Sequence, residues 1–314
     1  MESFLITEEK LIITDHEDSA VLQLIPQENQ DKVNEYRKKY YLPDDLFAWD
    51  HVPEVAPRFE KLPHANLPDA FLLVLTNIVP TDDFSPITDQ FEIFTIVYSK
   101  DLLLCFYPES SVFFKNVIHT REENFSSLAN FVGHCFLHLY QNYTKELQFK
   151  KKCIDKLDQA ARDSTSNEEL FRLTDTTRNM VYLENALETL DLTVQSLAKQ
   201  KDFMDSLNDQ ALAIDIQMYN RQTVKLVHLY RDLLETISGL FSDMMSNHLN
   251  HLMKFLESTA LVISVPTLIG GFWGMNTGGL PGRHHGFGFW LVVMIAGALA
   301  LIMALFLKKK NYFK

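Results

Sequence analysis

Two long apolar stretches stand at the end of the chain. Residues 255–273 carry one charged side chain, Glu257, and residues 287–307 carry none. At about 1.5 Å per residue, a helix of either length crosses roughly the 30 Å of a bilayer core. The connection between them, residues 274–286, is short. The pattern predicts a transmembrane helical hairpin with spans at about 255–273 and 287–307. A hairpin buried in a soluble core is the competing interpretation, and uncharged stretches of this length at a chain end disfavour it.

Helical periodicity dominates the middle of the chain. Residues 124–265 contain no proline, and their only glycines are Gly133 and Gly239. Apolar residues recur every three or four positions there, which is typical of amphipathic helices. We expect three long helices with breaks near 163–166 and 200–202, the first break offering several N-caps. The third helix would run from about 206 to 273, on the order of 100 Å. A helix of this length needs neighbours, in a bundle or in an oligomer.

The first part of the chain, up to about residue 117, has a mixed pattern. Short β-rich runs predict strands at 3–7, 10–14, 20–24, 70–75, 91–98 and 102–106, and a polar stretch predicts a helix at 29–39. The pattern indicates an α/β or α+β domain, and it does not reveal the order of strands in the sheet. We therefore divide the chain into an α/β cytoplasmic domain at 1–123, a long-helix hairpin and stalk at 124–254, and the transmembrane hairpin at 255–314.

Charge is distributed unevenly between these parts. Residues 1–254 carry 24 basic and 40 acidic side chains, a net of −16, whereas the remainder has a net of 5 − 1 = +4. An acidic body disfavours nucleic acid as a partner and suits a cation. Lys254 precedes the first span, and residues 308–310 are three lysines that directly follow the second. Basic residues mark the cytoplasmic side of a membrane. We therefore expect a multi-pass protein of the plasma (inner) membrane with both termini in the cytoplasm.

A stripe of small and polar residues follows the third helix at alternating steps of three and four. Its members are Asn250, Met253, Glu257, Ala260, Ser264, Thr267, Gly271 and Gly274. Polar groups are costly against lipid, so this face should look toward water or another helix. A 3.5-residue period suits parallel packing around a symmetry axis. Both a pore lining and a small-residue packing seam between helices fit this stripe.

The first span ends in the tripeptide Gly274-Met275-Asn276. Here the chain resembles the CorA family of divalent-cation (Mg²⁺/Co²⁺) transporters, which carry Gly-Met-Asn at this place. The resemblance extends over essentially the whole chain and is most specific over the last 70 residues or so. It implies a homopentamer, with a funnel-shaped cytoplasmic part and a pore lined by the first span, that passes Mg²⁺, Co²⁺ or Ni²⁺ down the membrane potential without a cofactor. Mg²⁺ itself would be the transported ion and possibly also a regulatory one.

The resemblance also assigns roles to particular residues. Gly274, Met275 and Asn276 would form the selectivity filter, where a ring of Asn276 amides hydrogen-bonds the hydrated ion. The resemblance implies that Met253 and Leu256 form apolar gating rings, that Asn250 lines the inner mouth, and that Thr267 and Gly271 line the pore. Family members also sense Mg²⁺ through acidic residues between subunits, and Asp215 lies near one such position.

The chain departs from the family pattern at three places. The loop after Asn276, read as Asn-Thr-Gly-Gly-Leu-Pro-Gly, looks more like the ZntB branch, which is associated with zinc. Glu257 stands where an uncharged residue is common, and it would either face the pore or pair with Lys254, with the pair slightly favoured. Ser264 stands at a position where family members commonly have an apolar residue that forms a ring around the pore. A Zn²⁺ transporter of the ZntB branch therefore remains an alternative.

Other function classes have less support. A tail-anchored coiled-coil adaptor without transport would not need a polar stripe that ends in Asn276. No nucleophile–base grouping, phosphate-binding glycine loop or cofactor motif suggests an enzyme. His134 and His138 lack the glutamate of a zinc-protease motif and are interpreted as ordinary helix residues, and three scattered cysteines are interpreted as reduced thiols. His284 and His285 are a weaker candidate for Zn²⁺ capture at the outer mouth.

Overall fold

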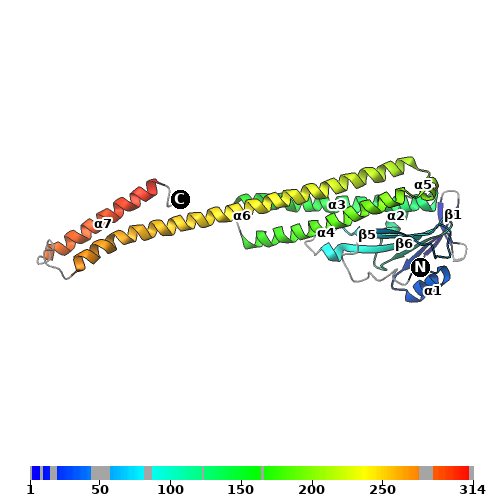
Figure 1. Cartoon of the computed structure of the whole chain (residues 1–314), viewed down its shortest axis with the longest axis horizontal. Coiled ribbons are helices and arrows are strands. Elements are labelled where there is room, and N and C mark those ends of the chain that lie inside the picture. Colours follow the sequence, from blue (N-terminus) through cyan, green and yellow to red (C-terminus); the bar gives the residue numbers. More distant parts are fainter. Residues whose placement is uncertain are drawn as a thin grey trace. The chain divides into compact units, whose positions relative to one another are not determined.

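The structure, a computed structural model, describes residues 2–7, 10–14, 20–43, 57–80, 87–121, 124–163, 166–275 and 286–310. By its internal contacts the chain divides into two compact units. The first comprises residues 1–160 and 166–237, and the second comprises residues 161–165 and 238–314. The strands and most helices belong to the first unit, and the second contains the later part of the long helix that spans residues 210–274 and the last helix, α7 (Gly286–Lys309), labelled in Figure 1.

The first unit is built on a mixed sheet of seven strands. These are β1 (Glu2–Thr7), β2 (Lys10–Ile13), β3 (Leu22–Pro26), β4 (Arg58–Lys61), β5 (Phe71–Ile78), β6 (Phe91–Tyr98) and β7 (Leu103–Tyr107). Their order is β2-β1-β3-β7-β6-β5-β4, in which β3 and β7 pair in parallel and all other neighbours pair antiparallel. All eight residues of β5 are buried. A strand without an exposed face must have a packed layer on both sides of the sheet.

Helices supply these two layers. On one face α1 (Gln30–Tyr40) packs Val33 and Tyr36 against a core that contains Leu72 of β5 and Val97 of β6. On the other face lie α2 (Phe113–Thr120) and α3 (Leu128–Asp163). The ring of Phe94 lies 4.6 Å from that of Phe113 in α2, centroid to centroid. The first unit is thus an α/β domain with the sheet between two helical layers.

Long helices follow the sheet domain. α3 ends at Asp163, and α4 (Asn167–Ala198) begins after Ser166, whose hydroxyl accepts a hydrogen bond from the Glu169 N–H at 3.3 Å. This N-cap confirms the predicted break. A short helix, α5 (Lys201–Leu207), precedes α6 (Gln210–Gly274), which has 65 residues. The predicted start of the third helix near 206 was therefore too early. Asn208 takes a left-handed conformation that ends α5, and the Asp209 carboxylate accepts from the Leu212 N–H and starts α6.

The expected strands and the helix at 29–39 are present, with ends shifted by at most three residues. Three of the elements named above were not expected, namely α5, β4 and α2. β4, read Arg-Phe-Glu-Lys, lacks a strand pattern and exists because it pairs with β5 at the sheet edge. α2 is only eight residues long, which gives too few turns for a clear helical period. The three cysteines are free in the structure, and all of them are buried.

Among the residues that the structure describes, two helices are long and apolar enough to cross a membrane. They are α6 and α7 (Gly286–Lys309), and the most apolar windows of the two helices have only 6% and 11% of their residues buried. A core hairpin of a soluble protein would be covered on most of its surface. The low burial therefore favours the transmembrane interpretation over the buried one.

Candidate functional site

The candidate pore residues share one face of α6. At about 100° per residue, positions 250 to 274 of the predicted stripe fall within an arc of about 120°. Met253, Ala260, Thr267 and Gly274 repeat every seven residues, and Asn250, Glu257, Ser264 and Gly271 form a second column with the same period. All of these residues are exposed in the single chain, and so is Leu256. The face is therefore free for contact with water or with other subunits.

The opposite face of this segment is the covered one. Between residues 250 and 275, the buried and half-buried residues are Ser258, Thr259, Val262, Val265, Pro266, Ile269 and Trp273. Ser264 and Val262, like Thr267 and Val265, are two positions apart, which places them about 200° apart around the helix axis. The covered face therefore lies almost directly behind the exposed stripe.

α7 provides the matching surface. Its buried and half-buried residues also recur every three or four positions, and they are Gly288, Val292, Ala296, Ala300, Met303, Ala304 and Leu307. Most are small, which lets two membrane helices approach closely. Figure 1 shows α7 turning back along the end of α6. The hairpin thus packs through the back of α6 and leaves the small, polar stripe uncovered.

A shallow groove follows the exposed stripe. It is lined by Ala260, Ser264, Thr267, Gly271 and Met275 together with apolar neighbours, among them Phe272. The hydroxyls of Ser264 and Thr267 donate to the backbone oxygens of Leu261 and Ile263, at 2.9 Å each. Their hydrogens are therefore used within the helix, and the hydroxyl oxygens remain as acceptors on the groove. Acceptor oxygens between small residues such as Ala260 and Gly271 suit a water-filled path for cations, although Ile263, Leu268 and Phe272 also line the groove.

The predicted filter follows the end of this groove. Only Gly274 and Met275 of its three residues belong to the described part of the chain. Gly274 closes α6, and Met275 follows it, with its backbone N–H donating to the oxygen of Phe272. A Cβ added to Gly271 or Gly274 would meet no atom within 4 Å in the single chain. Asn276, His284 and His285 lie outside the described residues.

Glu257 is exposed on the stripe, and Lys254, one turn earlier and outside the stripe, is exposed too. Within the described part of the chain, neither an ion pair nor a hydrogen bond joins the two side chains, so the slightly favoured pairing is not formed in the single chain. Asp215 is exposed on the part of α6 that belongs to the first unit. In the residues that the structure describes, it does not belong to a cluster of metal-ligand side chains.

The two histidines of α3 are packing residues, as the sequence indicated. His134 is buried with its ring 5.8 Å from that of Phe125, and burial lowers its pKa to about 4. The ring of His138 lies 5.2 Å from that of Phe113, and burial lowers its pKa too. Both rings therefore stay neutral at pH 7 in a largely aromatic setting.

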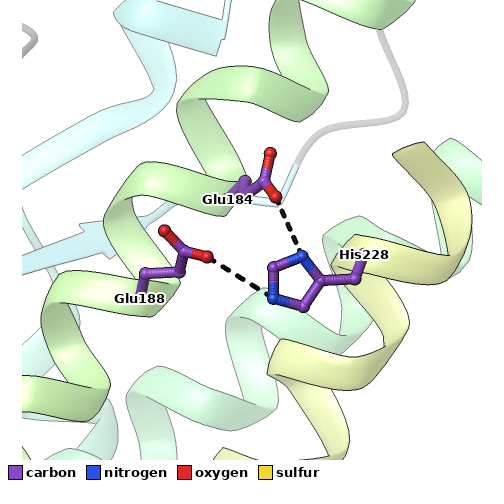
Figure 2. Close-up of side chains that lie close together, drawn as sticks. All are labelled: Glu184, Glu188 and His228. Atoms are coloured by element: carbon purple, nitrogen blue, oxygen red, sulfur yellow. Dashed lines mark hydrogen bonds and ion pairs between the residues drawn. The ribbon is translucent and has the colours of Figure 1, made fainter. Parts of the chain in front are cut away.

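One cluster was missed by sequence reasoning. Glu184 and Glu188 on α4 meet His228 on α6, and one ligand atom from each residue lies within 4.8 Å of the others (Figure 2). The spacing of the two glutamates, one helical turn apart, is visible in the sequence. Their approach to a histidine 44 residues after Glu184 depends on how α4 packs against α6.

Comparison with known proteins gives this geometry a context. A family model described as "CorA-like Mg2+ transporter protein" matches residues 26–309. The proteins named "Cobalt/magnesium transport protein CorA" from Thermotoga maritima and Methanocaldococcus jannaschii are 25% and 21% identical to the chain over 159 and 180 residues. These matches cover 51% and 57% of this chain and 45% and 56% of the relatives, so the chain spans about half the length of the curated relatives it matches.

The same fold is found in a solved structure of full length. The CorA magnesium transporter from Methanocaldococcus jannaschii superposes with a TM-score of 0.77 at 16% identity, covering 99% of this chain and 97% of the other. An N-terminal sheet domain, long helices and two C-terminal apolar helices are common to both, and the two apolar helices indicate a membrane location. Because the family model covers nearly the whole chain, the chain belongs to the CorA-like Mg²⁺ transporter family.

Proposed function

We propose that the chain is one subunit of a homopentameric channel that carries divalent cations, Mg²⁺ in the first place, across the plasma membrane. The observation that carries the proposal is the exposed stripe on α6. It is small and polar, it has a seven-residue period, and it lies opposite the face through which α6 packs on α7. A single subunit contributes one such face, so several copies around an axis are needed to enclose a path.

The stripe has a chemical order along the helix. Asn250 and Met253 stand at one end, Glu257 follows, and the middle is lined by Ala260, Ser264 and Thr267. Met253 and Leu256 would form an apolar constriction, which opens and closes by wetting and drying. Five copies of Glu257 would place negative charge at the inner end of the path and attract cations. The hydroxyl oxygens of Ser264 and Thr267 would accept hydrogen bonds from the waters of a hydrated ion.

Gly274, Met275 and Asn276 would act as the selectivity filter. Mg²⁺ releases its waters reluctantly, so a ring of neutral amide oxygens can hydrogen-bond the intact hydration shell and select it by size. Co²⁺ and Ni²⁺, which also carry a shell of waters, would pass the same ring. Flow would be driven by the membrane potential and the concentration gradient.

The proposed orientation places both termini, and the acidic first unit, in the cytoplasm. Lys308 and Lys309 end α7, Lys310 follows them, and Lys254 precedes the first span, so the basic residues near the membrane gather on one side. Asp215 would then lie on the cytoplasmic side, where it would help to sense Mg²⁺ if a neighbouring subunit supplied a second carboxylate.

A Zn²⁺ transporter is the second candidate, and the observation that favours it is the glycine-rich loop after Asn276, which looks like that of the ZntB branch. The same stripe would line its path. The two candidates differ in the ion that the filter and the loop select, and transport measurements separate them directly.

The test is flux into liposomes. We would reconstitute the purified protein with a Mg²⁺-sensitive dye inside, impose an inside-negative potential, and compare wild type with Asn276→Ala. Wild type should show influx that depends on the potential, and the substitution should abolish it. Asn116→Ala, an exposed asparagine on α2 in the first unit, is the matched control and should transport as wild type does.

Competition with Co²⁺, Ni²⁺ and Zn²⁺ would then rank the ions. Zn²⁺ flux without Mg²⁺ flux would assign the chain to the zinc branch. If folded and inserted protein passes none of these ions, transport is wrong and the membrane-anchored adaptor remains.

A further inference from the structure

A half-buried cluster of ligand-type side chains lies between α4 and α6, in the first unit. Glu184 and Glu188 are one turn apart on α4, and His228 reaches toward them from α6 (Figure 2). The distance from His228 Nδ1 to a Glu184 carboxylate oxygen is 2.8 Å, and that from Nε2 to a Glu188 oxygen is 3.4 Å. The imidazole ring is thus held between two carboxylates on one neighbouring helix.

The spacing of these atoms suits a metal ion. Zn²⁺ binds histidine nitrogen and carboxylate oxygen at about 2.0–2.2 Å, which places tetrahedral ligand atoms about 3.4 Å apart. The three ligand atoms here lie within 4.8 Å of one another. An ion bonds only one ring nitrogen, so the imidazole of His228 would turn until a single nitrogen faces both carboxylates. The Glu188 side chain is 54% exposed and can adjust to the turned ring, whereas Glu184 is only 12% exposed and holds its place.

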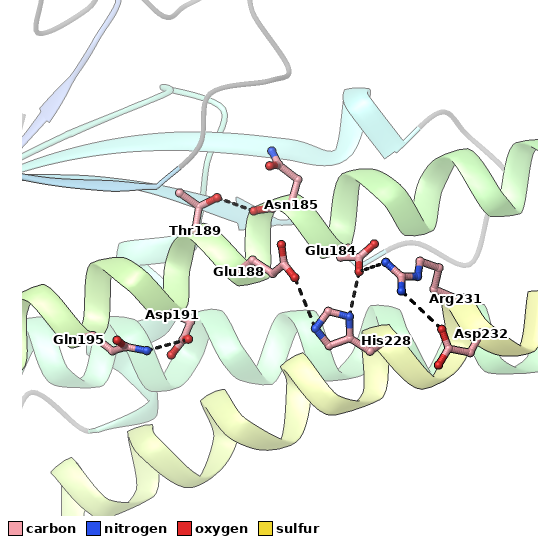
Figure 3. Close-up of polar contacts among 9 residues, drawn as sticks. All are labelled: Glu184, Asn185, Glu188, Thr189, Asp191, Gln195, His228, Arg231 and Asp232. Carbon is pink, nitrogen blue, oxygen red and sulfur yellow. Dashed lines mark hydrogen bonds and ion pairs between the residues drawn. The ribbon is translucent and has the colours of Figure 1, made fainter.

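Charge in the surroundings favours a cation. Figure 3 shows Asp232 beside Arg231, which also pairs with Glu184, whereas Asp191 lies further along α4 beside Gln195. The carboxylates of Glu184, Glu188 and Asp232 thus outnumber the one guanidinium that pairs with them, which leaves an excess of negative charge at the cluster. A divalent ion would offset most of this charge, at a site that water and ions reach because the His228 side chain is 38% exposed.

Arg231 competes for the same carboxylate. Its Nη1 lies 2.5 Å from the Glu184 oxygen that also faces His228, and its Nη2 lies 3.5 Å from Asp232. The Glu184 carboxylate raises the pKa of Arg231, so the guanidinium stays charged. In the absence of metal, Arg231 therefore neutralises Glu184. On metal binding it would keep Asp232 as its partner.

We propose that Glu184, Glu188 and His228 bind one divalent cation of the Zn²⁺, Co²⁺ or Ni²⁺ type, which joins α4 to α6 within a single subunit. Imidazole together with carboxylates suits these ions, whereas Mg²⁺ prefers oxygen ligands alone. The site is distinct from the stripe on α6, and it does not depend on the proposed transport. Because α6 continues from this site into the first span, a bound ion would fix α4 to the helix that enters the membrane.

The test is metal binding by the full-length protein in detergent, carried out with Asn276→Ala, His284→Ala and His285→Ala combined as the background so that the filter and the two loop histidines contribute less. Zn²⁺ would be titrated against a chromogenic chelator. The background protein should bind one high-affinity Zn²⁺ per chain through this cluster, and His228→Gln and Glu188→Gln should each weaken that binding at least about 10-fold. His119→Gln, on α2, is the matched control and should leave binding unchanged.

Arg231→Gln should change the Zn²⁺ affinity in the opposite direction. Removing the competing guanidinium should strengthen Zn²⁺ binding several-fold, a result that a purely structural role of the cluster would not produce. Thermal melting without metal checks that each variant folds, and Zn²⁺ should raise the melting temperature of the background but not that of His228→Gln. Unchanged Zn²⁺ binding in folded His228→Gln, or weaker binding in Arg231→Gln, would show that the cluster is an ion network without a metal.

Discussion

Cysteine accessibility along α6 can separate a pore lining from a packing seam. The perturbation is a set of single cysteines in matched pairs, with Ser264→Cys and Thr267→Cys on the exposed stripe and Val262→Cys and Ile269→Cys on the covered face. Members of each pair are two residues apart, hence about 200° apart around the helix. They lie at almost the same depth in the membrane, so depth cannot explain a difference between them.

The magnitude follows from the chemistry of the thiol. The thiolate is the reactive form, and it is favoured in water. A charge at the centre of a bilayer costs about 3 kcal/mol relative to water, which corresponds to roughly 100-fold less thiolate. A positively charged methanethiosulfonate reagent should therefore modify the two stripe cysteines at least about 100-fold faster than the two on the covered face, and the modification should block flux.

The native protein is a suitable background for this assay. Cys105 and Cys135 are fully buried, Cys153 is 7% exposed, and burial raises the pKa of all three thiols. Wild type should therefore keep its flux after treatment. Divalent-ion flux into liposomes before and after the reagent is the readout. Equal rates at positions 262 and 264, or modification of Ser264→Cys without block, would refute the pore assignment and leave the stripe as a helix–helix seam.

Three further predictions concern the first unit, and thermal melting in detergent measures each of them. Glu146 and Lys150 form an ion pair at 2.8 Å with side chains 0% and 4% exposed. Lys150→Met should cost about 3–5 kcal/mol because it leaves a buried charge unpaired, whereas Lys150→Met with Glu146→Met should recover most of that loss; a double variant no more stable than the single one would contradict this. The pKa of His134 is lowered by burial from 6.5 to about 4, so stability present above pH 6.5 should fall by roughly 1–2 kcal/mol at pH 5, as the unfolded chain takes up the proton, and His134→Gln should remove this slope. Tyr140→Phe deletes the 3.0 Å hydrogen bond to Asn220 at a buried site, and the expected loss is about 1–3 kcal/mol, or roughly 2–10 °C; an unchanged melting temperature would mean that another donor satisfies the amide.

Much of the fold could be predicted from local patterns. The two membrane spans follow from the length of their apolar stretches alone. The break before α4 follows from Ser166, whose side chain caps the helix through the backbone N–H of Glu169, only three residues later. The candidate pore stripe was also predictable, because residues three and four apart on one helix necessarily share a face. Its role still rests on the motif at Gly274-Met275-Asn276 and on the period of seven.

Other features depended on segments far apart in the chain. The parallel pairing of β3 with β7, and the inclusion of β4 at the sheet edge, arise from backbone hydrogen bonds that carry little residue preference. Likewise, nothing near His228 in the sequence indicates that Glu184 will lie 2.8 Å from its ring.

The sequence by itself determined roughly where the long helices run, which of their faces are apolar, and where two apolar spans of membrane length lie, since each of these depends on residues within a few turns. Only the tertiary structure decided that α7 packs behind the stripe of α6, which leaves that stripe free, and that α4 meets α6 at a cluster of ligand-type side chains. These contacts depend on loop geometry and side-chain packing over tens of residues, and their free energy is spread over many weak contributions that no local pattern records.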